Sequence, residues 1–345
     1  MHLKNEHKSK NSIIGEGLKR LRNNLSQSIA DQLVLPVITA PMFLVSSPDM
    51  VISASSAGII GSFPSLNART VEVLGEWMER ISEELNDLRI SEPNRSIAPW
   101  ALNIVLHQNE NTRVKEEIAL IKKYKPPIVM TALGNPAEVV KIVHSYGGKV
   151  FSDVTTLVHA KKAAKSGVDG LILVCCGAGG HAGTLNSFAF IREIKEFWDG
   201  ITILAGGISS GQDILASQAL GADLVYMGTR FIAASESFAS GEYRKMLIES
   251  KIDDLVYTDV YSGIKANYLK SSIISAGLDP DNLGTRASFI QKDIDIKVWK
   301  DIWSAGHCVG RTKRAQTVLE IIADLNREYE EAQKSLLTSR KQVIG

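Results

Sequence analysis

The chain has 345 residues, of which 44% are hydrophobic and 22% charged, and its formal net charge is +1. This composition is typical of a globular protein that buries a sizeable core. The near-neutral charge gives no electrostatic reason to expect binding to nucleic acid or to an anionic membrane surface. One barrel of roughly 250 residues with added segments accounts for the length as well as two domains would.

The N-terminal residues carry no apolar stretch of signal-peptide type before Leu33, and no apolar run in the chain is long enough to span a membrane. Basic residues between Met1 and Arg22 predict a solvated lead-in. The three cysteines, Cys175, Cys176 and Cys308, are too few and wrongly spaced for a disulfide framework or a zinc site. We therefore expect a cytoplasmic protein without a metal site, as a monomer or a homodimer.

Eight short apolar segments recur along the chain, and helical stretches follow them. Strands that are continuously apolar are typical of a parallel sheet covered on both faces. Eight such units, with no GxGxxG after the first, favour a closed (β/α)₈ TIM barrel over an open dinucleotide-binding sheet. The predicted strands are Val34–Ala40, Gly58–Ser62, Trp100–Val105, Ile128–Thr131, Val150–Asp153, Gly170–Val174, Thr202–Ala205 and Leu224–Met227.

Several predicted helices have terminal signals. Asn135 precedes Pro136, as an N-cap precedes a proline in the first turn, and Gly167 and Gly221 follow helical segments. The helices predicted within the barrel are Thr70–Leu85, Asn111–Lys123, Pro136–Ser145, Thr155–Ser166, Ser187–Trp198 and Ser210–Leu220.

The alternation of strands and helices ends after Ala239. Glu242–Asp301 is polar and predicts a helical and loop extension near the barrel mouth. Thr317–Leu336 predicts a long terminal helix whose inner face carries Leu319, Ile322 and Leu325. We thus divide the chain into a lead-in (1–32), a barrel (33–240) and a C-terminal extension packed on the barrel (241–345).

Active sites of this fold lie at the C-terminal ends of the strands. The sixth strand is followed by Gly177–Gly183, with four glycines in seven residues and with His181 directly after Gly180. Glycines let the backbone approach a flat or anionic ligand closely. A histidine held in such a loop at a barrel mouth is a candidate catalytic residue, and we select His181.

Glycine turns also follow the seventh and eighth strands, at Ala205-Gly206-Gly207 and at Gly228-Thr229. These two loops are where barrels of this kind bind phosphate. Polar or backbone contacts to a ring are expected from the ends of other strands, at Ala40, Met42, Asn103 and Thr131. We find no paired carboxylates of glycosidase type, no HExxH and no GxSxG. A phosphate-bearing cofactor therefore fits better than hydrolysis, and FMN fits best because no dinucleotide motif is present.

Together these motifs resemble the nitronate monooxygenase family, formerly called 2-nitropropane dioxygenases. The resemblance covers roughly Leu33 to Val309. It rests on Ala40-Pro41-Met42, Ala57-Gly58 with Gly61, Asn103, Ala178-Gly179-Gly180-His181, Ala205-Gly206-Gly207-Ile208, Gly228-Thr229-Arg230-Phe231, Ser262-Gly263 with Asn267, and Trp303-Ser304-Ala305-Gly306.

The resemblance implies an FMN-dependent TIM barrel that oxidises alkyl nitronates with O₂. It places the catalytic histidine at His181 and the FMN-phosphate contacts at Gly206, Gly207, Gly228 and Thr229. It also implies a polar ring contact from Asn103 and a backbone contact from Met42. Two stretches depart from the family pattern on the substrate side: Phe43-Leu44-Val45 replaces a Gly-Gly pair, and Cys175-Cys176 stands where many members have Gln or Glu. We expect that cysteine pair to be strand packing, because adjacent side chains on a strand point to opposite faces.

The expected reaction yields a carbonyl compound and nitrite, with His181 taking a proton from a neutral nitroalkane or facing the nitronate anion. Two alternatives stay open. One is an FMN-dependent enoyl-thioester reductase that uses NAD(P)H, and the other is a flavin-binding protein without turnover.

Overall fold

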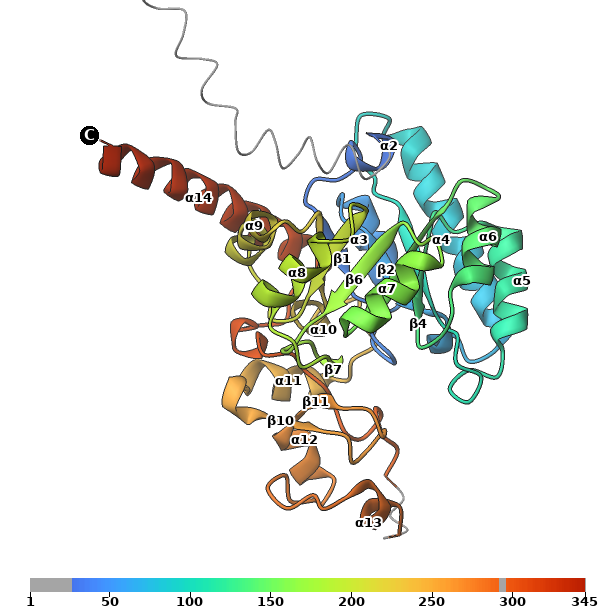
Figure 1. Cartoon of the computed structure of the whole chain (residues 1–345), viewed down its shortest axis with the longest axis vertical. Coiled ribbons are helices and arrows are strands. Elements are labelled where there is room, and N and C mark those ends of the chain that lie inside the picture. The colour runs from blue at the N-terminus through green and yellow to red at the C-terminus, as the bar shows by residue number, and fades with distance from the viewer. Residues whose placement is uncertain (1–26, 292–295, 345) are drawn as a thin grey trace, which may run out of the picture.

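The computed structural model describes residues 27–291 and 296–344. Figure 1 shows a barrel with surrounding helices, an extension beyond one end of the barrel, and a terminal helix that leaves the body. Most of the predicted lead-in lies outside the described residues; a short helix, α2 (Gln27–Ala30), ends just before the barrel. The three-part division of the chain remains our proposal.

The predicted (β/α)₈ barrel is confirmed. Eight strands pair in the order β1-β9-β8-β6-β5-β4-β3-β2, and every pair is parallel. A single parallel bridge, Ile38 with Ile60, joins the two end strands. The strands are β1 (Val37–Thr39), β2 (Gly61–Pro64), β3 (Trp100–Val105), β4 (Ile128–Ala132), β5 (Lys149–Val154), β6 (Gly170–Val174), β8 (Ile201–Ala205) and β9 (Leu224–Met227).

The second strand begins later than predicted, because Gly58 has a φ of 81° and forms the turn after a helix that was not predicted. That helix, α3, begins after Ser47, whose side chain accepts a hydrogen bond from the Met50 N–H, and it has Pro48 in its first turn. The remaining barrel helices match the predictions to within a few residues, except at the C-terminal end of α4. These are α4 (Val71–Ser91), α5 (Val114–Tyr124), α6 (Ala137–His144), α7 (Leu157–Lys165), α8 (Ser187–Lys195) and α9 (Gly211–Leu220). The elements that were not predicted are α3 (Pro48–Ser56), α10 (Thr229–Ile232) and a 3₁₀ turn, η2 (Ser65–Asn67).

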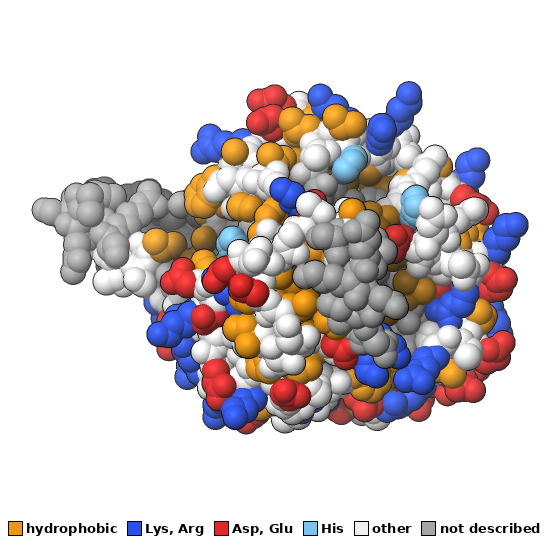
Figure 2. Space-filling model, turned by 90° about the horizontal axis from the view of Figure 1, so that it is seen from below, with side chains coloured by type: hydrophobic (Ala, Val, Ile, Leu, Met, Phe, Trp, Pro, Cys, Tyr) orange, Lys and Arg blue, Asp and Glu red, His pale blue; other side chains and the backbone are white. Residues whose placement is uncertain are grey.

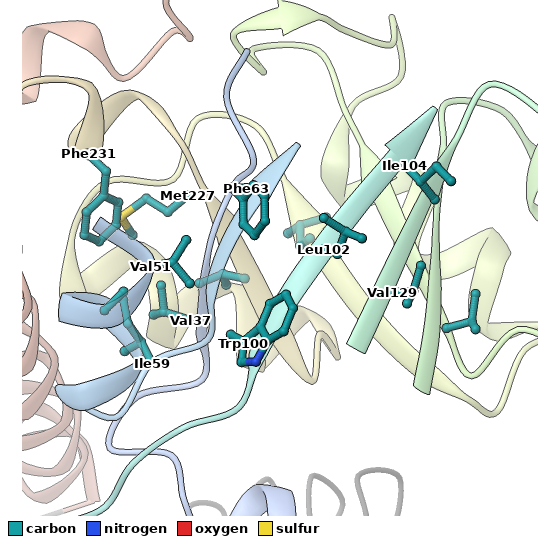
Figure 3. Packing of buried hydrophobic residues seen from close by; sticks show 14 of the residues in the cluster. Val37, Val51, Ile59, Phe63, Trp100, Leu102, Ile104, Val129, Met227 and Phe231 are labelled. Carbon is teal, nitrogen blue, oxygen red and sulfur yellow. The ribbon is translucent and has the colours of Figure 1, made fainter. Parts of the chain in front are cut away.

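Apolar side chains form two layers because alternate strand residues point to opposite faces. Ala101 and Phe151 belong to the cluster inside the barrel, whereas their neighbours Leu102 and Val150 belong to the cluster between strands and helices. Figure 3 shows the outer cluster, in which the Phe63 and Trp100 rings stack with centroids 6.2 Å apart. Both layers thus hold the ends of the strands in fixed positions.

The extension contains a sheet that was not predicted. Its three strands pair in the order β10-β11-β7, and β7 (Gly180–His181) is the Gly-His pair of the loop after β6. Both pairings are antiparallel. The elements after the barrel are α11 (Gly241–Glu249), η3 (Ile252–Asp254), β10 (Leu255–Thr258), β11 (Ala266–Leu269), α12 (Lys270–Ser275), α13 (Arg286–Gln291), η4 (Val309–Arg311) and α14 (Val318–Ile344).

The terminal helix α14 lies against the barrel through its first half. Ile322 and Leu325 are buried as predicted, but Leu319 is 51% exposed and that prediction is wrong. Buried Val318 and Ile321 complete the inner face instead, because residues 318, 321, 322 and 325 have the i, i+3, i+4, i+7 spacing of one helix face. None of the described helices combines the length and the apolarity needed to cross a bilayer.

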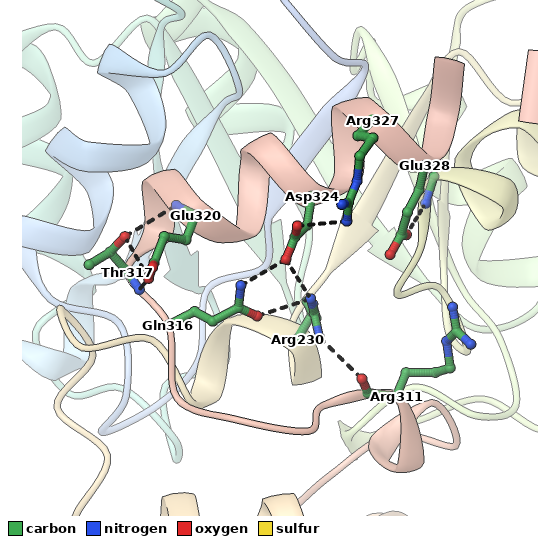
Figure 4. Close-up of polar contacts among 9 residues, drawn as sticks. Arg230, Arg311, Gln316, Thr317, Glu320, Asp324, Arg327 and Glu328 are labelled. Carbon is green, nitrogen blue, oxygen red and sulfur yellow. Dashed lines mark hydrogen bonds and ion pairs between the residues drawn. The ribbon is translucent and has the colours of Figure 1, made fainter. Parts of the chain in front are cut away.

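Arg230 connects α14 to the barrel, as Figure 4 shows. Its guanidinium donates hydrogen bonds to the Arg311 carbonyl and to Gln316 Oε1, both at 3.1 Å, and lies 3.8 Å from Asp324. A second contact joins α14 to α9, where the Gly211 N–H donates to Glu328 Oε2 at 2.9 Å. The start of α9 is therefore held tightly against the helix that follows the extension.

We predict that Gly211→Ala destabilises the fold. A Cβ at Gly211 would lie 2.0 Å from the backbone nitrogen of Tyr329, so α9 and α14 would have to separate. Overpacking of this kind costs about 1–3 kcal/mol. Thermal unfolding should show a lower Tm than wild type. Gly241→Ala is the matched control, because it also stands at the start of a helix but its Cβ would meet nothing within 4 Å; an equal loss in both variants would contradict the prediction.

Candidate active site

A cavity of about 1450 Å³ opens at the C-terminal ends of the barrel strands. It is lined by every residue that the sequence analysis selected: Ala40, Met42, Asn103, Thr131, Gly180, His181, Ala205, Gly206, Gly207, Gly228 and Thr229. Figure 2 views the molecule from the side of the extension, with hydrophobic side chains near the centre and charged ones mostly toward the edge. The structure thus brings the selected residues together; their roles remain predictions.

The turn after β8 requires glycine. Gly206 and Gly207 have φ angles of 112° and 74°, which other residues rarely adopt. A Cβ at Gly207 would meet no protein atom within 4 Å, so this backbone borders open space. Among the described residues, no acceptor is found for the backbone N–H of Gly207 or of Thr229. These two N–H groups are therefore available to a ligand.

The extension closes against the loop after β6 and the turn after β9. The Gly306 N–H donates a hydrogen bond to Thr229 Oγ1 at 2.8 Å. A Cβ on Gly306 would lie 2.6 Å from the Gly177 carbonyl oxygen, which explains why glycine stands there. The segment before η4 is thus wedged between the loop after β6 and the loop after β9, and it completes the wall of the cavity.

The polar groups at the strand ends differ in whether they already have a hydrogen-bond partner within the protein. Asn103 shares a strand face with Ala101, so its buried side chain points into the barrel. The Thr131 hydroxyl is already bonded to Ser152 Oγ and to the Phe151 carbonyl. The Met42 N–H donates to Ser46 Oγ at 2.9 Å. Asn103 is consequently the better placed of the three to bind a ligand through a hydrogen bond.

His181 lies in β7 and is held from three sides. Its backbone pairs with Ala266 of β11, its Nε2 is 3.0 Å from Ser262 Oγ, and its ring meets the Trp299 ring edge-on at 5.2 Å. Burial lowers the pKa of His181 below its ordinary value, so the imidazole is neutral at pH 7.

The hydrogen bonds of Ser262 assign the tautomer of that neutral ring. The Ser262 hydroxyl donates its one proton to the Ile264 carbonyl at 2.9 Å. Ser262 Oγ must then accept the bond from His181, so the proton of the imidazole is on Nε2. Nδ1 is left with a free lone pair, and this atom is the one that can take a proton from a substrate.

Several cavity residues were not selected from the sequence. Asp153, Tyr226, His159 and Lys162 all line the cavity, and Asp153 and Tyr226 come from β5 and β9. Burial raises the pKa of Asp153 to about 7. No sequence signal could have identified Asp153, because only the structure shows that Phe151, two residues earlier, points into the barrel. His159 lies in α7, a helix that was predicted from the sequence without selecting this residue.

The prediction that the two adjacent cysteines are buried strand packing is confirmed only for the burial of Cys175, because both residues follow the end of β6 (Gly170–Val174) and Cys176 is exposed. Cys175 is fully buried in the outer apolar layer and Cys176 is exposed. Burial raises the pKa of the Cys175 thiol to about 12, which makes it a poor nucleophile. Among the described residues, no group of three or more histidine, cysteine or acidic side chains is arranged to hold a metal ion.

The sequence matches the family described as nitronate monooxygenase over residues 26–328. A curated relative, "Probable nitronate monooxygenase" from Staphylococcus aureus (strain MSSA476), is 26% identical over 284 residues, covering 73% of this chain and 79% of the relative.

Two solved structures are similar to this fold. FabK from Thermotoga maritima has a TM-score of 0.73 at 22% identity, covering 93% of this chain and 98% of that protein. A nitroalkane oxidase from Streptomyces ansochromogenes has a TM-score of 0.72 at 21% identity, covering 90% of this chain and 99% of that protein. At these identities the two structures show a shared fold.

The family match spans most of the chain, and it includes the barrel, the Gly-Gly-His loop and both glycine turns. The chain therefore belongs to the nitronate monooxygenase family, and it is an oxidoreductase of that family.

Proposed function

We propose that this protein binds FMN in the barrel mouth and oxidises alkyl nitronates with O₂ to carbonyl compounds and nitrite. The observation that carries the proposal is a cavity lined both by His181 and by two glycine turns with free backbone N–H groups. Membership of the family supports the reaction class. The S. aureus relative bears the name of this activity, and a nitroalkane oxidase shares the fold.

The residues present fit FMN. Gly206, Gly207, Gly228 and Thr229 would hold the phosphate through backbone N–H groups, and Gly207 leaves room for it. Ligand sites of about 300–1,000 Å³ are usual, so a cavity of about 1450 Å³ would take both the cofactor and a substrate. Asn103 would bind a polar edge of the ring, with Ala40, Met42, Thr131, Gly180 and Ala205 lining its surroundings.

Bound FMN would supply the electron acceptor for the substrate and the electron donor for O₂. His181 would serve the substrate. A neutral nitroalkane must lose a proton from carbon, and His181 Nδ1 carries the free lone pair to take it. A nitronate has already lost that proton. Ser262 would keep the ring in the reactive tautomer, and Trp299 would keep it in place.

The reaction itself is tested by incubating the purified protein with an alkyl nitronate while O₂ and nitrite are monitored. We expect O₂ consumption together with nitrite release. The same protein should show no rapid bleaching of flavin absorbance by NADH or NADPH without O₂. Bleaching by a reduced nicotinamide without nitrite formation would instead favour the enoyl-thioester reductase, and bound flavin with neither reaction would favour a protein without turnover.

The phosphate site is tested with Gly207→Asp. The carboxylate would enter the space proposed for the phosphate and repel it, so the variant should lose FMN on purification while its far-UV circular dichroism stays unchanged. Gly147→Asp is the matched control, since Gly147 also has a positive φ (85°) and a Cβ there would likewise meet nothing within 4 Å. Stoichiometric FMN in Gly207→Asp would place the phosphate elsewhere.

The role of His181 is tested with His181→Asn. If Nδ1 is the base, kcat/KM should fall roughly 10²–10⁴-fold with a neutral nitroalkane and much less with preformed nitronate. The wild-type rate with the neutral substrate should rise with pH, because only the uncharged ring accepts a proton. It should level off below the ordinary histidine pKa of about 6.5, since burial lowers the pKa of His181.

Ser262→Ala provides the matched variant, because it keeps the imidazole and removes its partner at Nε2. It should reduce kcat with the neutral nitroalkane and leave the nitronate reaction near wild type. Unchanged rates with both substrates in His181→Asn would remove His181 from the mechanism.

A further inference from the structure

The carboxyl group of Asp153 lies in the upper layer of the barrel interior. On β5, Phe151 belongs to the interior cluster, and Val150 and Val154 belong to the outer one. Alternation along the strand therefore directs Asp153 inward, toward the cavity that it lines. It stands at the mouth end of the strand, one residue before the strand ends.

One oxygen of this carboxyl group is left unsatisfied by the described protein, although the residue as a whole is only partly buried. Its Oδ1 is buried and has no hydrogen-bond partner among the described residues. Its register partner on β6 is Ile172, and the interior cluster contributes Met130 from β4, so apolar side chains flank it. An unsatisfied buried polar atom costs about 1–3 kcal/mol. The packing of the barrel offers no compensation, which indicates that the group is retained for a ligand.

Tyr226 of β9 is a titratable group that lines the same cavity and interacts electrostatically with Asp153. Its hydroxyl contacts Met130 Sδ at 3.5 Å, and burial next to Asp153 raises its pKa well above the ordinary value. Tyr226 is thus neutral and supplies no counter-charge. The other charged or titratable side chains at the cavity are exposed, namely His107, Glu110, His159, Lys162 and Lys165. Burial lowers the pKa of His181 and raises the pKa of Tyr243, so both of these are neutral at pH 7. The charge at the floor of the cavity therefore depends on Asp153 alone among the described residues.

We infer that Asp153 is a further residue of the cofactor site, whose carboxyl group faces the ring system of the bound flavin and controls how readily that ring accepts electrons. The inference rests on the proposed function. Reduction adds negative charge to the ring, so an ionised carboxylate beside it opposes reduction, whereas a protonated carboxyl can donate a hydrogen bond to it. Because burial raises the pKa of Asp153 to about 7, both states are populated near neutral pH.

The test is the midpoint potential of the bound flavin in wild type and in Asp153→Asn, measured by dye equilibration at pH 5.5 and pH 8.5. The amide keeps the shape of the acid and carries no charge. We expect a more positive potential in the variant at pH 8.5 and little difference at pH 5.5, where the wild-type carboxyl is already protonated. Equal potentials in the two proteins at both pH values would overturn the inference.

Asp199→Asn is the matched control. It makes the same change of charge at an exposed residue before β8, at the opposite end of the barrel, and it should leave the potential unchanged at both pH values. A wild-type protein that holds no flavin would contradict the proposed function, before any comparison of variants. Loss of flavin from Asp153→Asn alone, with Asp199→Asn still loaded, would support contact between Asp153 and the cofactor.

A second measurement needs no cofactor. The folded-state pKa of Asp153 is raised above the unfolded value of about 3.9, so the folded protein binds the extra proton between these two values. Wild type should therefore lose stability relative to Asp153→Asn as the pH rises from 4 to 7. Urea unfolding of flavin-free protein at pH 5 and pH 8 measures this. A stability difference that is the same at both pH values would show that the carboxyl is not buried, and would overturn the inference.

Discussion

The antiparallel pairing of β7 with β11 is the contact on which the site depends. Without it, the residues after β6 would form a glycine-rich loop with many accessible conformations. The pairing fixes the backbone of Gly180 and His181 against Asn267 and Ala266. The Asn267 amide also donates a hydrogen bond to the Ala178 carbonyl at 2.8 Å. The extension thus positions the candidate catalytic histidine at the barrel mouth, because His181 pairs with β11 and with none of the eight barrel strands.

The same extension supplies the rest of the mouth. Gly306 contacts Thr229 at the glycine turn after β9, and Ser262 and Trp299 hold the His181 ring. The barrel therefore supplies the free backbone N–H groups and the polar side chains at the strand ends, and the extension fixes the position of His181. Elements that follow the barrel in the sequence are therefore part of the same candidate site as the barrel strands.

The sequence predicted the elements that depend on local pattern. β3, β6 and β9 have the predicted bounds because each is a short, mostly apolar run. The turn after β8 could be predicted because the positive φ angles of Gly206 and Gly207 favour glycine, and the turn after β9 because Gly228 follows the strand directly. The helix α3 was missed, since its three serines leave only a weak apolar stripe.

Other features depend on contacts between distant residues and had no local signal. The pairing of β11 with β7 joins residues far apart in the sequence, and neither strand has an alternating apolar pattern. The role of Ser262 follows only from its distance to His181. In the sequence, Asp153 does not differ from other acidic residues near strand ends. Only the structure shows that it points into the barrel, where its Oδ1 has no hydrogen-bond partner among the described residues. Leu319 was misplaced because adjacent helix residues point about 100° apart, and its neighbour Val318 is the one that shares the buried face of Ile322 and Leu325.

The central claim is that the barrel mouth holds one flavin with a single phosphate. It is tested most directly by the chromophore of the purified protein, released by heat and compared with FMN and FAD standards. The account predicts a yellow protein that releases FMN, close to one per chain after reconstitution. Release of FAD, or no flavin retained after incubation with FMN, would contradict it.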